Sequence, residues 1–145
     1  MGFFFEQIHQ MNYWIIKSEP VKYPWHQLVS DGRTCWDGIR NYTARINLRE
    51  MRVGDICCFY HSNEGKEIVG LAKVIREVYQ DPTTTDTAWV AVDIEPLKKL
   101  TKPVTLQQMK AEPLLQSNDL IRIGRLSVCK LSQEGFDLIV NLSEC

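Results

Sequence analysis

The feature that most constrains this sequence is a succession of short runs rich in β-branched and aromatic residues, each broken by turn residues. Such runs favour pleated backbone, and the expected strands lie at residues 12–17, 55–61, 68–79, 89–97 and 126–131. Helical patterns lie between and after them, at residues 24–29, 39–51, 105–111, 114–120 and 132–142. The order lacks the regular strand–helix alternation of parallel folds. The sequence therefore predicts an α+β fold: a small, curved or barrel-like sheet of five or more strands flanked by short helices.

The composition is that of one globular domain. Among 145 residues, 44% are hydrophobic and 24% are charged, a balance unlike that of a disordered tail. No apolar run approaches the roughly 18 residues of a membrane span. Residues 1–11 lack the features of a secretory signal, and we expect them to be an extension without a role in function. The functional domain is expected over residues 12–142.

Five cysteines bear on the compartment and on metal binding. They are odd in number and have no short paired spacing, which favours reduced thiols in the cytoplasm over a disulfide framework. Cys57 and Cys58 are neighbours in an expected strand, where side chains alternate between faces. We therefore expect both to be buried, and we expect neither a metal site nor a cofactor.

Local charge is more informative than the total. The 17 basic and 18 acidic residues leave a net charge of -1, which excludes a uniformly basic surface for nucleic acid. Between Arg33 and Arg52, however, five arginines accompany only two acidic residues. On a helix, Arg45, Arg49 and Arg52 would share one stripe, with Asn41 a turn earlier. This stripe either binds phosphates or is a solvated face paired to acids elsewhere, and the pattern alone favours neither.

Aromatic residues gather in the same part of the chain. Eight of them occur between residues 13 and 60, and most are expected in the core. Trp36 differs, because it lies in a polar, glycine-containing segment that we expect to be a turn (residues 34–38). Aromatic faces stack on nucleobases, so Trp36 is the candidate wall of a base-binding pocket.

Polar residues follow two expected strands at the points where they end. Residues 17–19 finish the first strand, and residues 61–63 finish another. If these strands are neighbours, the polar side chains converge on one rim, where they offer donors and acceptors to the edge of a flipped-out base. Turn chemistry alone would also account for Ser18, Ser62 and Asn63.

Seven segments, in order, carry a resemblance to a known family. They are residues 13–20 (YWIIKSEP), 36–45 (WDGIRNYTAR), 48–55, 59–63 (FYHSN), 68–74, 79–83 and 125–128. With these segments the chain resembles the EVE domain family over about residues 12–142. The resemblance implies a PUA-like fold, a small β-barrel with flanking helices that is related to YTH domains. It also implies recognition of modified bases in DNA or RNA, including methylated or hydroxymethylated cytosine.

The resemblance also implies roles for residues by position. The base-binding pocket would consist of Lys17, Ser18, Glu19, Trp36, Asn41, His61, Ser62 and Asn63. The residues that would contact backbone phosphates or brace the pocket are Arg40, Arg45, Arg49 and Arg125. The sequence departs from the family pattern at Ile46, where relatives commonly carry asparagine. It departs again in the turn of residues 64–67, where Glu64 and Glu67 bring acids near the expected rim.

Two other classes of function remain open. An enzyme acting on a modified nucleotide could use Glu19 and His61 as base and acid, although the sequence carries no established catalytic motif. A module that binds a small metabolite or a protein is compatible with the near-neutral charge.

Hydrogen bonds to a base edge need the same residues without any chemistry. We therefore predict a non-catalytic reader that flips a modified base out of DNA or RNA and stacks it on Trp36. The flanking strand would lie along Arg45 and Arg49. The predicted partner is nucleic acid carrying a modified base, with no membrane involved, and the sequence identifies no protein partner.

Overall fold

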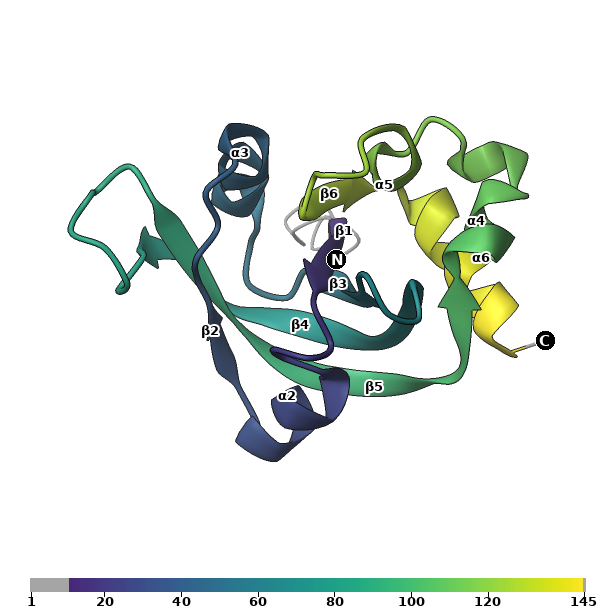
Figure 1. Ribbon diagram of the computed structural model, residues 1–145, viewed down its shortest axis with the longest axis horizontal. Coiled ribbons are helices and arrows are strands. Elements are labelled where there is room, and N and C mark those ends of the chain that lie inside the picture. Colours follow the sequence, from purple (N-terminus) through teal and green to yellow (C-terminus); the bar gives the residue numbers. More distant parts are fainter. Residues whose placement is uncertain (1–10, 145) are drawn as a thin grey trace, which may run out of the picture.

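The computed structural model describes residues 11–144, and within this range strands and helices are both present (Figure 1). The strands are β1 (Tyr13–Ser18), β2 (Thr34–Trp36), β3 (Ile56–His61), β4 (Glu67–Gln80), β5 (Val90–Thr105) and β6 (Val128–Leu131). The helical segments are α2 (Trp25–Asp31), α3 (Tyr42–Glu50), α4 (Leu106–Lys110), the 3-10 turn η1 (Pro113–Leu115), α5 (Asp119–Arg122) and α6 (Gln133–Glu144). The expected α+β class is confirmed. Of the expected N-terminal extension, residues 1–10 lie outside the described range.

The six strands form one sheet in the order β2-β5-β4-β3-β1-β6. β1 is parallel to β3 and antiparallel to β6, and the other neighbours are antiparallel. The long β4–β5 hairpin changes register at several points, and such irregularities bend and twist a sheet (Figure 1). The expectation of a barrel is wrong, because the sheet stays open between its edge strands β2 and β6. These strands have only three and four residues, which leaves few backbone groups with which to close the gap.

β5 runs from Val90 to Thr105 and is longer than the strand expected at residues 89–97. The sequence signal fades after Pro96 because lysines and a second proline, Pro103, follow. In this second half β5 pairs with β4, while β2 pairs only with residues 92–94. Proline and lysine are tolerated on such an edge, since one side of the strand needs no ladder hydrogen bonds.

α3 begins later than the helical pattern predicts. The expected helix started at residue 39, but Asn41 is extended and its side chain accepts a hydrogen bond from the Ala44 backbone N–H at 2.9 Å. Asn41 is therefore the cap that starts the helix. Ala44, Leu48 and Met51 are buried, which confirms the apolar periodicity. The arginine stripe is shorter than predicted, because α3 ends at Glu50 and Arg52 lies beyond it.

The helix expected at residues 114–120 is also interrupted. In its place are η1 and α5, and α5 is capped by Asn118, whose side chain accepts from the Leu120 backbone N–H. α4 and the long α6 follow expectation more closely, and α6 packs against β5 (Figure 1).

The core holds the first helix tightly on the sheet. Trp25 begins α2, and its indole lies on the backbone of Gly70 in β4, where an added Cβ would come within 2.6 Å of the ring. The Trp25 ring also meets Phe59 of β3 edge to face, at 5.5 Å between centres. Cys57 and Cys58 are buried as expected, and burial raises the pKa of Cys58 to about 12.

Within residues 11–144, none of the helices is both long and apolar enough to cross a membrane. The same residues hold no group of three or more His, Cys, Asp or Glu side chains placed to bind a metal ion.

Candidate functional site

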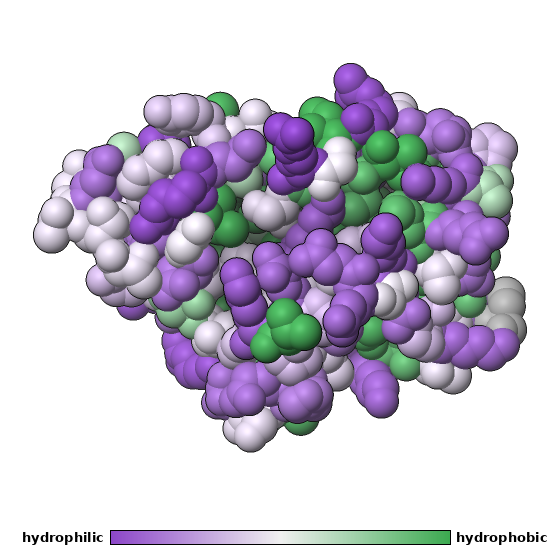
Figure 2. All heavy atoms as spheres, in the orientation of Figure 1, coloured by the Kyte–Doolittle hydropathy of each residue, from purple (hydrophilic) through white to green (hydrophobic). Residues whose placement is uncertain are grey.

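A cavity of about 530 Å³ opens between the two edges of the sheet. One wall comes from β2 and the residues after it, and the opposite wall comes from the segment that leads into β6. The ends of β1 and β3 complete it, and Figure 2 shows a recess near the middle of this face. The lining residues are Lys17, Ser18, Glu19, Lys22, Tyr23, Thr34, Cys35, Trp36, Asp37, Ile39, Ser62, Asn63, Gly124, Arg125 and Ser127.

The two strand ends converge as the sequence predicts. In the parallel pairing of β1 with β3, Ser18 lies opposite His61, and the Ser62 backbone N–H donates to the Ser18 carbonyl oxygen at 2.9 Å. Of the residues expected in a base pocket, the lining includes Lys17, Ser18, Glu19, Trp36, Ser62 and Asn63. Asn41 and His61 are not part of it.

Trp36 occupies a different setting from the expected turn. It is the last residue of β2 and is only 9% exposed. Its indole meets Phe59 at 5.7 Å and Tyr23 at 6.0 Å between ring centres, both nearly edge to face. The residue therefore has two roles in the structure, since it belongs to the core and also forms part of the cavity wall.

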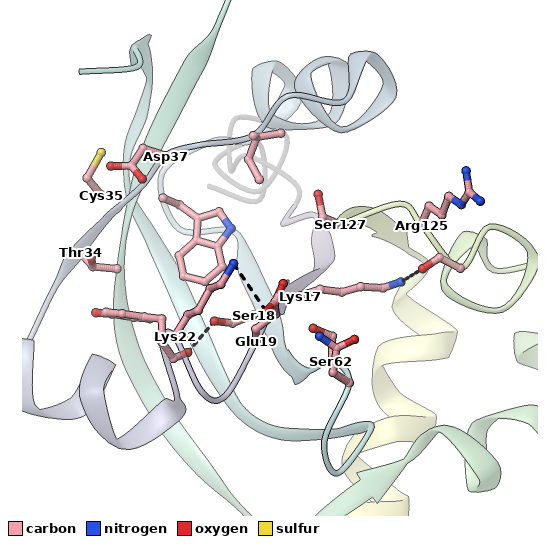
Figure 3. Close-up of a pocket in the computed structure, with 15 residues that line it drawn as sticks. Lys17, Ser18, Glu19, Lys22, Thr34, Cys35, Asp37, Ser62, Arg125 and Ser127 are labelled. Atoms are coloured by element: carbon pink, nitrogen blue, oxygen red, sulfur yellow. Dashed lines mark hydrogen bonds and ion pairs between the residues drawn. The ribbon is translucent and has the colours of Figure 1, made fainter. Parts of the chain in front are cut away.

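Ser18 presents acceptors to the cavity. Its Oγ donates to the Tyr23 carbonyl oxygen at 2.5 Å, as the dashed line in Figure 3 marks. A hydroxyl has one proton and two lone pairs. With the proton committed to Tyr23, Ser18 can accept a hydrogen bond from a ligand but has none left to donate.

Lys17 is the matching donor. Its Nζ donates to the Gly124 carbonyl oxygen at 2.7 Å, and its backbone N–H donates to the Ser127 carbonyl oxygen at 2.9 Å. Figure 3 shows the side chain extending toward the segment that carries Arg125. Burial lowers the pKa of Lys17, and a nearby Cys129 opposes this change. Since an ammonium has three protons, two remain for a ligand.

The side chains of His61 and Asn41 form hydrogen bonds to the backbone of the protein. His61 Nε2 accepts from the Trp25 backbone N–H at 3.0 Å. Burial lowers the pKa of His61, with an opposing effect from Glu67 and a reinforcing one from His26. Asn41 caps α3. Both side chains thus accept hydrogen bonds from backbone N–H groups, His61 from Trp25 and Asn41 from Ala44.

Arg40 is a bracing residue. Its guanidinium bonds to the buried Asp81 at 2.9 Å and to Thr83 Oγ1 at 3.1 Å. Asp81 also accepts from the Gly38 backbone N–H at 2.8 Å. Burial alone would raise the pKa of Asp81, but hydrogen bonds from Thr83, Arg40 and Gly38 hold it well below its usual value. This network fixes the segment after Trp36 against the β4–β5 connection.

The other three arginines differ in how far they are committed. Arg45 Nη1 donates to the Ala88 carbonyl oxygen at 3.0 Å, so this side chain also braces the β4–β5 connection. Arg49 reaches the same oxygen at 3.4 Å and is exposed. Arg125 is exposed at the cavity rim, and Figure 3 shows its guanidinium directed away from the other labelled residues.

Several lining residues are not found by sequence reasoning. Tyr23 lies just before α2 and Thr34 is the first residue of β2, whereas Gly124 and Ser127 come from a segment far along the chain. Asp37 stood inside a recognised motif but had no assigned role. Cys35 also lines the cavity, where burial raises the pKa of its thiol.

Comparison with known proteins identifies the family of this chain. The EVE domain family matches residues 12–142. The chain belongs to the EVE domain family. Mouse thymocyte nuclear protein 1 is 34% identical, in an alignment that covers 92% of this chain and 74% of the mouse protein. The expected cytoplasmic location stays a prediction, since these relatives are named as nuclear proteins.

Solved EVE-like structures agree with the fold. An NMR structure from Rhodopseudomonas palustris has a TM-score of 0.88 and 44% identity, covering 92% of this chain and 94% of that one. Human THYN1, solved in complex with DNA containing 5-methylcytosine, has a TM-score of 0.85 and 30% identity. The match covers 92% of this chain and 98% of the THYN1 chain. A YTH domain from Zygosaccharomyces rouxii has a TM-score of 0.60 at 14% identity, a likeness of fold alone.

Proposed function

We propose that this EVE domain binds a modified, cytosine-type nucleobase, extruded from a nucleic acid strand, in the cavity between the sheet edges. The observation that carries the proposal is the combination of one aromatic wall with a ring of donors and acceptors at the ends of β1 and β3. The volume of about 530 Å³ falls within the range of about 300–1,000 Å³ typical of small-molecule sites. Human THYN1, with the same fold, was solved with 5-methylcytosine DNA.

The lining groups suit the polar edge of cytosine. That edge combines an exocyclic amino donor with acceptor atoms. Ser18 offers only lone pairs, and the Glu19 carboxylate adds a second acceptor; both can receive the amino protons. Lys17 keeps two protons for the acceptor atoms. A pocket with this pairing distinguishes bases by which of its buried polar groups find partners.

Base binding explains the arrangement better than catalysis does. The acid–base pair considered from the sequence needs Glu19 and His61 together. Glu19 lines the cavity, and its Oε2 lies 3.7 Å from Lys22 Nζ. His61 lies outside the lining, and its Nε2 accepts a hydrogen bond from the Trp25 backbone N–H. The Cys35 thiol has a raised pKa, which disfavours the reactive thiolate. We therefore propose a non-catalytic role.

The test is a set of binding titrations with matched oligonucleotides that carry cytosine, 5-methylcytosine or 5-hydroxymethylcytosine, in DNA and in RNA, at two salt concentrations. We expect a preference for one modified base that persists at higher salt, because contacts to the base do not depend on counterion release. Equal binding of all oligonucleotides would contradict the proposal. Asn63→Gly offers a sharp variant, since Asn63 has φ 65° and glycine keeps that backbone while removing the side chain.

Two controls separate the alternatives. Incubation of each oligonucleotide with catalytic amounts of protein, followed by mass analysis, should return unchanged material. Conversion of the modified base would instead establish an enzyme. Free modified nucleosides should bind more weakly than the same base within a strand, and equal affinity would indicate a metabolite-binding module.

A further inference from the structure

An arginine side chain and two aromatic rings contact one another outside the cavity lining. The Arg45 guanidinium carbon is 4.9 Å from the centre of the Tyr42 ring and 4.8 Å from the centre of the Trp89 ring. The two rings are 5.5 Å apart and tilted by 37°. We call Tyr42, Arg45 and Trp89 the aromatic platform. It joins the start of α3 to the connection between β4 and β5.

The Tyr42 side chain is open to solvent. It is 67% exposed, more than any other aromatic residue in residues 11–144. Contact with Arg45 and Trp89 holds the ring in position but leaves much of its surface uncovered. A ring that is already held in place loses little conformational freedom when a ligand stacks on it.

The charge around the platform favours a polyanion. Arg49 is exposed one turn after Arg45, and in the described part of the chain neither residue forms an ion pair with an acid. Arg40, by contrast, is paired with Asp81 at 2.9 Å. An open aromatic ring beside uncompensated guanidinium groups matches a nucleotide, which combines a flat base with a phosphate.

The platform lies within reach of a strand whose base occupies the cavity. Ile39 lines the cavity, and Tyr42 follows it three residues later. Since a fully extended chain of three residues spans at most roughly 11 Å, the Cα atoms of Ile39 and Tyr42 lie within that distance of each other. Successive nucleotides of one DNA strand are about 3.4 Å apart along the helix axis. A nucleotide within roughly three steps of the extruded base can therefore contact Tyr42.

We propose that the aromatic platform is a second stacking subsite, which binds an unmodified nucleobase of the strand that flanks the extruded base. Tyr42 supplies the stacking surface, Arg45 and Trp89 hold it, and Arg49 contacts the adjoining phosphate. Stacking of this kind is tolerant of sequence, because every base has a flat face. The inference rests on the proposed function, since the base in the cavity fixes where the strand runs.

The test is a double-mutant cycle on short single strands. Each strand carries the preferred modified base, flanked on both sides either by ordinary nucleotides or by abasic ones. Tyr42→Leu should weaken binding of the ordinary strand by about 5- to 150-fold, the range that one stacked base contributes, and should leave binding of the abasic strand unchanged. Tyr42→Phe keeps the ring and should bind both strands as the wild type does. Val29→Ala, at a 52% exposed position outside the cavity lining and the platform, is the matched control.

Two results would overturn the platform. Equal weakening of both strands by Tyr42→Leu would assign Tyr42 a purely structural role, and unchanged binding of both would remove it from the interface. Thermal unfolding of each variant verifies that it is folded. The proposed function is tested separately, with two abasic-flanked strands that carry either the modified base or unmodified cytosine. If that function is wrong, the wild type binds these two strands equally well. An effect of Tyr42→Leu limited to strands with flanking bases would support the platform even then.

Discussion

The imidazole Nε2 of His61 accepts a hydrogen bond from the backbone N–H of Trp25 at 3.0 Å. The last residue of β3 is thereby tied to the first residue of α2, and α2 precedes the strand that carries the cavity wall. Since a protonated imidazole has no acceptor nitrogen, this bond requires neutral His61.

This bond predicts a pH dependence of stability. The folded protein lowers the pKa of His61 through burial, so the unfolded chain binds the proton more readily. The free energy of unfolding should therefore fall as the pH drops below about 6.5, the ordinary histidine value. Urea unfolding between pH 5 and pH 8 measures the effect. His61→Gln should flatten the curve, whereas His26→Gln removes only a smaller contribution to the lowered pKa and should keep most of the dependence; the reverse pattern would refute the assignment.

A side chain added at Gly70 is predicted to destabilise the fold. A Cβ at this position would lie 2.6 Å from the Trp25 ring, and the indole has little room to move in the core. Gly70→Ala should therefore lower the free energy of unfolding by about 1–3 kcal/mol, as overpacking does. Gly124→Ala is the control, because an added Cβ there meets nothing within 4 Å. Equal stability of the two variants in chemical unfolding would contradict the packing.

Loss of the Asp81 charge should release the segment after Trp36. Asp81→Asn weakens bonds to Arg40 and Thr83 and to the Gly38 backbone N–H. We expect a loss of about 1.5–3 kcal/mol in unfolding free energy, the range for hydrogen bonds to a charged group. The lowered pKa of Asp81 means that its contribution is present above the ordinary carboxyl pKa of about 4 and fades in more acidic solution. Asp137→Asn, on the surface of α6, should change neither the stability nor its acid dependence.

Trp36→Phe is predicted to reduce the preference for the modified base. The smaller ring should retain packing against Phe59 and Tyr23 while removing part of the cavity wall. Alanine would confuse the result, because emptying a buried tryptophan site costs about 3–5 kcal/mol in stability. The readout is the ratio of affinities for modified and unmodified oligonucleotides, with Val29→Ala as the reference. An unchanged ratio would exclude the indole from the binding surface.

Arg49 and Arg40 should differ in their effect on salt dependence. Arg49 is exposed and uncommitted to an acid in the described chain, so Arg49→Gln should reduce the slope of log affinity against log salt by about 0.9 on DNA. Arg40→Gln should lower stability and leave that slope nearly unchanged, because Asp81 already neutralises the guanidinium. Identical slopes for both variants and the wild type would remove Arg49 from the phosphate contacts.

Much of the site could be predicted because it depends on the ends of strands. Lys17, Ser18 and Ser62 follow strong β signals, and the parallel pairing of β1 with β3 brings them together. The cap formed by Asn41 could also be predicted from the sequence. Asparagine is a favoured cap residue, and Asn41 stands immediately before the apolar periodicity of Ala44, Leu48 and Met51.

How far each arginine is committed could not be predicted from the local charge. Arg40, Arg45 and Arg49 all lie in the basic segment of residues 33–52. Asp81 binds Arg40, and the Ala88 carbonyl oxygen accepts from Arg45 at 3.0 Å and from Arg49 at 3.4 Å, in each case from more than 35 residues away in sequence. Spacing along a helix determines which side chains share a face, but it contains no information on which distant groups pack against that face.

The sequence by itself determined the family, the α+β class and the residues at the ends of β1 and β3, because motifs and periodicity are local properties of the chain. Only the tertiary structure decided that the sheet stays open, and that Gly124 and Ser127 face Trp36 across the opening. The reason is physical: closure depends on the lengths and pairing of β2 and β6, which are set by long-range hydrogen bonds and packing.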